Sequence, residues 1–180
     1  AAFDANPTSP FELALFLDVD TLVADEGRQL ATGSSGRPTR SFHARSDRRL
    51  LAGGWHQSAF DLSGTPILAP PSGSRVFLAG TTETGVAWLH TPTGAGAHVS
   101  YNQCLSSSGV VAYTGQAISG TAVIGELSLT ASAGEDGRRE WLAALDVETG
   151  SLLGAVDLSA HHNYQACAFL SHGRVAGVGQ

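Results

Sequence analysis

The chain has 180 residues and a net charge of −6, and charged residues make up only 14% of it, against roughly 25% in an average soluble domain. This acidic balance argues against nucleic acid or an anionic membrane as a partner, because both favour cationic surfaces. The 22 glycines and 7 prolines are spread along the chain and disfavour long helices. No apolar stretch reaches the roughly 20 residues that cross a bilayer. We therefore predict a single, mostly β domain over 1–180 with no membrane insertion.

Residues 1–24 are predicted to form an N-terminal strand or closing segment. Within them, LFLDVDTL resembles the first motif of haloacid-dehalogenase-like phosphatases, in which the first Asp (here Asp18) is the nucleophile and the second (Asp20) a general acid. Thr21 comes one position early for that motif, and a shift of one residue turns a strand side chain to the other face. The chain also lacks Lys, the cation that this family uses beside the phosphoaspartate. A strand that ends in an acidic turn is therefore favoured over the phosphatase.

A short pattern recurs along the chain: a polar turn, a small apolar run and then Gly. Its copies are DEGRQLATGS (25–34), SDRRLLAGGW (46–55), SGSRVFLAGT (72–81), SSGVVAYTGQ (107–116) and SHGRVAGVGQ (171–180). Further short apolar runs lie between the copies, at 55–62, 85–91 and 121–131, and each is bounded by turn residues. Such runs are typical of antiparallel meanders. Their repetition predicts short antiparallel sheets repeated around an axis.

The last two copies have similar residues before them, in YNQCLSSSGVVAYTGQ and NYQACAFLSHGRVAGVGQ. Cys104 and Cys167 therefore occupy equivalent positions of two repeats. We predict that each is a small buried residue on an inner strand. A disulfide between them and a reactive thiol are the less favoured alternatives.

The segment WLAALDVETGSLLGAVDL is predicted to be two strands, 141–147 and 151–158, joined by a tight turn. Gly150 would supply a positive φ in this turn. Asp146 precedes the turn, and its carboxylate can accept hydrogen bonds from the backbone amides of the turn.

The run ALDVETGSLLG (144–154) resembles the blade signature of quinoprotein-like β-propellers, Ala-x-Asp-x-x-x-Gly followed four residues later by a Trp that docks on a neighbouring blade. Gly154 stands where this Trp would be. DEGRQLATGS resembles the inner-strand text of WD40 propellers. The resemblance implies an all-β fold, a β-propeller or partial propeller built from antiparallel four-stranded blades. At about 40 to 45 residues per blade the chain would hold about four, which implies a segment of a longer propeller; a β-sandwich and a β-helix remain alternatives.

The resemblance implies a fold and not quinone chemistry, because the adjacent cysteine pair of quinone-dependent dehydrogenases is missing. The seven histidines lack the His-x-His and i, i+4 spacings of metal ligands, so we predict that they lie in loops or turns: His43, His56, His90, His98, His161, His162 and His172. Trp55, Trp88 and Trp141 are predicted to pack in the core or between blades. No catalytic, cofactor-binding or metal-binding residue is predicted, and no cofactor.

The leading hypothesis is a non-enzymatic scaffold that binds other protein subunits of a larger assembly through its loops. The alternative is an enzyme or a ligand-binding module that uses the mouth of the propeller channel. In that alternative, His56, His98, His161 and Asp157 would converge on one site.

Overall fold

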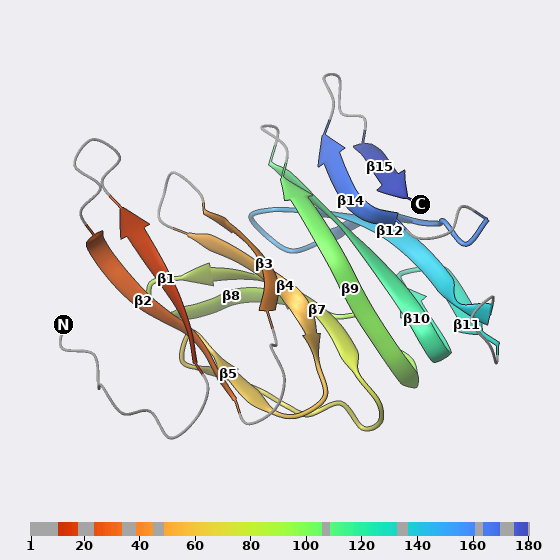
Figure 1. The fold of residues 1–180 in the computed structure, drawn as a ribbon, viewed down its shortest axis with the longest axis horizontal. Helices are drawn as coiled ribbons and strands as arrows, with labels where there is room; N and C mark the ends of the chain where they lie inside the picture. The colour runs from red at the N-terminus through yellow and green to blue at the C-terminus, as the bar shows by residue number, and fades with distance from the viewer. Residues whose placement is uncertain are drawn as a thin grey trace.

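The computed structural model describes the backbone of residues 11–17, 24–33, 39–44, 49–105, 109–132, 137–160, 164–169 and 175–179, and the side chains of 49–99, 109–132 and 137–160. Within these ranges every regular element is a β-strand, and every pairing is antiparallel (Figure 1). The predicted all-β, antiparallel fold is confirmed. The described part of the chain contains no helix long and apolar enough to span a membrane.

The strands form three sheets and a C-terminal hairpin. In spatial order, the first sheet contains β1 (Phe11–Leu17), β2 (Ala24–Gly33), β5 (Phe60–Leu62) and β6 (Thr65–Ile67). The middle sheet contains β3 (Thr39–Ala44), β4 (Leu50–His56), β7 (Arg75–Thr82) and β8 (Gly85–His90). The third sheet contains β9 (Gly96–Leu105), β10 (Val110–Ile124), β12 (Arg139–Asp146) and β13 (Leu152–Asp157), with β11 (Leu127–Ala131) on the far half of β10. The hairpin pairs β14 (Tyr164–Phe169) with β15 (Val175–Gly179).

The five copies of the sequence pattern fall on β2, β4, β7, β10 and β15. Four of these strands pair with the strand directly before them in the chain: β2 with β1, β4 with β3, β10 with β9 and β15 with β14. β7 is instead the third strand of the middle sheet. The repeated sequence pattern therefore lies mainly on the second strand of a hairpin.

The run 55–62 does not form one strand, because it crosses from one sheet to another. β4 ends at His56, and β5 begins at Phe60 and pairs with β2 of the first sheet. The reason lies in packing, because the short β5–β6 hairpin buries its apolar side chains against the middle sheet. The buried cluster at this contact is Ala52, Phe60, Leu62, Ile67, Phe77 and Ala79. The first two sheets are consequently interleaved along the chain, whereas β9, β10, β12 and β13 follow chain order in the third.

The inner strands β4 and β7 of the middle sheet are buried on both faces. Successive strand residues point to opposite faces, and those of β4 and β7 alternate between two clusters. Ala52 and Phe77 face the first sheet, whereas Leu51 and Leu78 belong to a second cluster shared with the third sheet. This explains why the sequences of both strands are continuously apolar and do not alternate between apolar and polar residues.

The first sheet, the middle sheet, the third sheet and the hairpin follow one another across the molecule (Figure 1). Among the predicted positions, Asp18, Asp20 and Thr21 lie outside the described residues. The strand before them, β1, is antiparallel to β2, and the described elements include no helix, unlike the α/β body that the phosphatase would need. Of the segment 1–24, the structure describes β1 and the first residue of β2.

Candidate functional site

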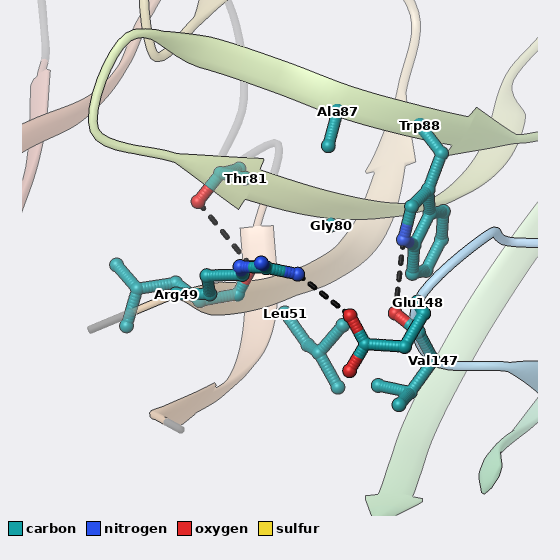
Figure 2. Close-up of a pocket in the computed structure, with 9 residues that line it drawn as sticks. Arg49, Leu51, Gly80, Thr81, Ala87, Trp88, Val147 and Glu148 are labelled. Carbon is teal, nitrogen blue, oxygen red and sulfur yellow. Dashed lines mark hydrogen bonds and ion pairs between the residues drawn. The ribbon is translucent and has the colours of Figure 1, made fainter. Parts of the chain in front are cut away.

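Trp88 of β8 joins the middle sheet to the third sheet. Its indole Nε1 donates a hydrogen bond to the carbonyl oxygen of Val147 at 3.0 Å. A Cβ atom added to Gly150 would lie 2.6 Å from Cδ2 of Trp88, so the ring lies directly against this glycine. Figure 2 shows the indole pointing from β8 towards Val147. A tryptophan of one sheet therefore docks on the turn between the last two strands of the next.

The blade pattern has its docking Trp at another position, which Gly154 occupies in this chain. The sequence pattern places the docking Trp four residues after Gly150, where Gly154 stands, and no described atom lies within 4 Å of a Cβ built there. The Trp that docks is Trp88, from the preceding sheet. Its own hairpin, AGTTETGVAW (79–88), matches ALDVETGSLL (144–153) at the first Ala and at Glu-Thr-Gly. This internal match is a signal for Trp88, although it places Trp88 one residue before the Trp position of the blade pattern.

The turn that receives Trp88 has the predicted geometry. Asp146 Oδ1 accepts hydrogen bonds from the amides of Glu148 (3.0 Å) and Thr149 (2.8 Å) and from the Thr149 hydroxyl (2.9 Å). Gly150 has φ +69°. The hydrogen bonds from Thr149, followed by that from Glu148, lower the pKa of Asp146, because they stabilise the carboxylate form. The predicted role of Asp146 is confirmed.

Replacing Asp146 with Asn should weaken the acid sensitivity of the fold. The pKa of Asp146 is lower in the folded chain, so its contribution to stability is present above the unfolded pKa of about 4 and is lost as pH falls through the folded value. The free energy of unfolding, measured in urea between about pH 7 and pH 2, should therefore fall less steeply for Asp146→Asn. Glu126→Gln removes an exposed carboxylate from another turn as a charge-matched control. Identical pH curves for Asp146→Asn and the unmodified chain would contradict this role.

An ion pair closes the outer side of the same contact. Arg49 and Glu148 approach to 2.6 Å, and each side chain is about half exposed (Figure 2). Exposed pairs of this kind contribute little to stability, because water and salt screen them. With Leu51 and Thr81 they border a small gap beneath the Trp88 indole.

His90 and Tyr113 form a second, partly buried contact between the same sheets. His90 Nε2 lies 3.1 Å from the Tyr113 hydroxyl. Burial lowers the pKa of His90 and raises that of Tyr113, because both charged forms lose hydration. Both groups are therefore neutral near pH 7, and the contact is a hydrogen bond between neutral groups.

The prediction that the histidines lie in loops or turns is wrong for those that the structure describes in strands: His43 in β3, His56 in β4, His90 in β8 and His98 in β9. Aromatic neighbours explain the burial of three of them. The ring centroids of His56 and Phe60 are 5.1 Å apart, those of His90 and Tyr113 5.7 Å, and those of His98 and Trp141 6.2 Å. His161, His162 and His172 lie outside the described residues.

Two of the four channel-mouth candidates lie beside the start of β7, where they contact different residues. His56 is the cross-strand partner of Arg75, and the His98 amide donates to the Ser74 carbonyl oxygen at 2.8 Å. Burial lowers the pKa of both histidines, and the charge of Arg75 lowers both further.

Asp157 does not join them, because it lies on β13 and its carboxylate accepts the Ser159 amide at 2.7 Å. His161 lies outside the described residues. Within the described ranges, no group of three or more His, Cys, Asp and Glu side chains is placed to hold a metal ion.

The tryptophans have the core role that was predicted for them. Trp141 is completely buried, and Trp55 and Trp88 are partly buried against the same cluster. Cys104 lies in β9 and Cys167 in β14, each on the first strand of a hairpin. This placement is consistent with equivalent positions of two repeats. The side chains of both cysteines lie outside the residues whose side chains the structure describes.

The described part of the chain is an all-β fold of antiparallel sheets that pack face to face in series. Comparisons of the chain with protein-family models, with curated proteins and with solved structures found no match.

Proposed function

We propose that the chain is part of a β-propeller that acts as a non-enzymatic scaffold for other protein subunits. The observation that carries the proposal is the middle sheet, which is enclosed by a neighbour on each face. A sandwich consists of two sheets, each with one buried face, whereas an internal blade of a propeller packs on both sides. The docking of Trp88 on the next sheet supports the same arrangement.

The neighbouring first strands of the sheets also support a radial arrangement. β9, the first strand of the third sheet, lies against β3, β4 and β7 of the middle sheet, and β14, the first strand of the hairpin, lies against β9. Contacts between first strands, such as β3 with β9 and β9 with β14, are expected around a central axis. The interleaved β5–β6 hairpin is a departure from simple four-stranded blades.

The outer strand of the third sheet offers a surface for a protein partner. In β13, Leu152 and Ala155 pack against the buried cluster, whereas Leu153 and Val156 remain 59% and 52% exposed. Exposing two large apolar side chains to water on one edge strand is unfavourable, and exposed apolar side chains of this kind often indicate an interaction site. We place the partner interface on this side of β13.

Site-specific photo-crosslinking in the source cells tests the scaffold function. A photoreactive amino acid at Val156 should give a discrete adduct with a specific protein subunit, identified by mass spectrometry. The matched control places the same amino acid at Glu126, which is exposed in another turn of the third sheet. Adducts that are equal at both positions, or that are missing at Val156, would overturn the proposal.

A further inference from the structure

A groove lies between the first and middle sheets, beside their outer strands β6 and β8. Its volume is about 340 Å³, and one wall is formed by the segment 66–71. The opposite side is formed by His56, Arg75, Leu89 and Thr91. Pockets for small ligands usually start at about 300 Å³ and are mainly apolar with a few polar groups. This groove has the size and the composition of a site for a small molecule.

The walls of the groove expose apolar side chains to solvent. Leu68 is 81% exposed and Leu89 is 42% exposed. Leu89 pairs with Ala79 across β7 and β8, which places it on the face of the middle sheet that the first sheet covers farther in. The groove therefore continues the apolar contact between the two sheets outward. A hydrocarbon group that fills it would remove this surface from water.

The polar end of the groove is formed by Arg75 and His56. They are directly opposite in the β4–β7 pair, so their side chains share one face of the sheet. Arg75 Nη2 donates to the Gly94 carbonyl oxygen at 2.7 Å, whereas its Nε is buried without a hydrogen-bond partner. No carboxylate among the described residues forms an ion pair with Arg75.

His56 provides a second polar atom without a hydrogen-bond partner at this end of the groove, and it is uncharged. Its side chain is 95% buried, since its exposure is 5%. Nδ1 lies 3.0 Å from the Ser58 carbonyl oxygen, and the buried Nε2 has no partner. Because a carbonyl oxygen can only accept, Nδ1 carries the proton and Nε2 is an acceptor. Burial lowers the pKa of His56, so the positive charge at this end of the groove belongs to Arg75.

We propose that this groove binds a small aliphatic carboxylate, with its hydrocarbon part between Leu68 and Leu89 and its carboxylate on the guanidinium of Arg75. A half-buried cation that lacks an anionic partner is costly, and a guanidinium matches the planar geometry of a carboxylate. The unsatisfied His56 Nε2 can accept a hydrogen bond from a water that also donates to the bound carboxylate. This site goes beyond the scaffold function and does not depend on it.

Titration of the purified full chain, followed by amide signals in two-dimensional NMR spectra, tests the proposal with three probes of equal chain length. Hexanoate should shift the signals of residues 67–69, 75 and 89 saturably. Hexanol and hexanamide can fill the same walls without offering a charge, so both should bind about ten- to a hundredfold more weakly, as expected for one charge-assisted contact. Equal binding of the three probes, or shifts spread over the whole chain, would overturn the proposal.

Two arginine variants separate the local contact from net charge. Arg75→Gln should lose at least about tenfold in affinity for hexanoate and little for hexanol. Arg49→Gln removes the same charge from the contact between the middle and third sheets and should leave hexanoate binding unchanged. Thermal unfolding shows whether each variant is folded. If Arg75→Gln fails to fold, the comparison of the three probes on the unmodified chain decides, and the crosslinking at Val156 still tests the scaffold separately.

Discussion

Replacing Trp141 with alanine is expected to lower the free energy of unfolding by about 3–5 kcal/mol, the usual cost of truncating a buried aromatic residue. Trp141 is the largest fully buried side chain of the described residues. It packs with Val111, Tyr113 and Leu145 in the cluster between the middle and third sheets. Gly115 lies directly against its ring, so the ring fills a space shaped for it. Urea unfolding followed by circular dichroism measures the change.

Leu153→Ala is the control for this substitution, because it also shortens an apolar side chain of the third sheet. Leu153 is mostly exposed, so its truncation should change the free energy of unfolding by no more than about 0.5 kcal/mol. Similar losses for the two variants would mean that Trp141 does not occupy the core between the sheets.

Gly150→Ala is expected to have the second largest effect, because two costs add at this residue. An alanine at φ +69° costs about 1–2 kcal/mol in backbone strain. The new methyl would also meet the Trp88 ring at 2.6 Å, and such overpacking costs about 1–3 kcal/mol more. Urea unfolding should therefore show a loss of about 2–5 kcal/mol.

Gly64→Ala separates these two costs. Gly64 has φ +81° in another turn, and nothing lies within 4 Å of the added methyl, so only the backbone strain applies. The excess loss in Gly150→Ala should largely disappear when Trp88 is also replaced by alanine, since the clash is then removed. An excess that persists without Trp88 would contradict the docking of Trp88 on this turn.

Local features of the fold could be predicted from the sequence. The hairpin around Asp146 and Gly150 was predicted at nearly its observed bounds, because a capping carboxylate and a positive-φ glycine act within four residues. The five pattern copies identified β2, β4, β7, β10 and β15, because apolar runs between turn residues are local signals.

Non-local features could not be predicted in the same way. The strand partner of β5 depends on which apolar surface Phe60 and Leu62 pack against. The local sequence pattern does not contain this information. The burial of His56 and His98 likewise depends on Phe60 and Trp141, which lie on other strands. The groove beside Arg75 is formed by four separate parts of the chain. For Trp88 the sequence does contain a signal, because its hairpin matches that of Gly150, but the match is one residue out of step with the blade pattern.

The middle sheet docks on the third sheet through Trp88, so the contact between the indole ring and Gly150 tests this packing most directly. Nuclear Overhauser spectra of the isotope-labelled chain report which protons lie close together. We expect cross-peaks between the indole ring protons of Trp88 and the α-protons of Gly150, with an Nε1 proton protected by its bond to Val147. An indole proton that exchanges freely with water and a ring without cross-peaks to Gly150 would contradict the account.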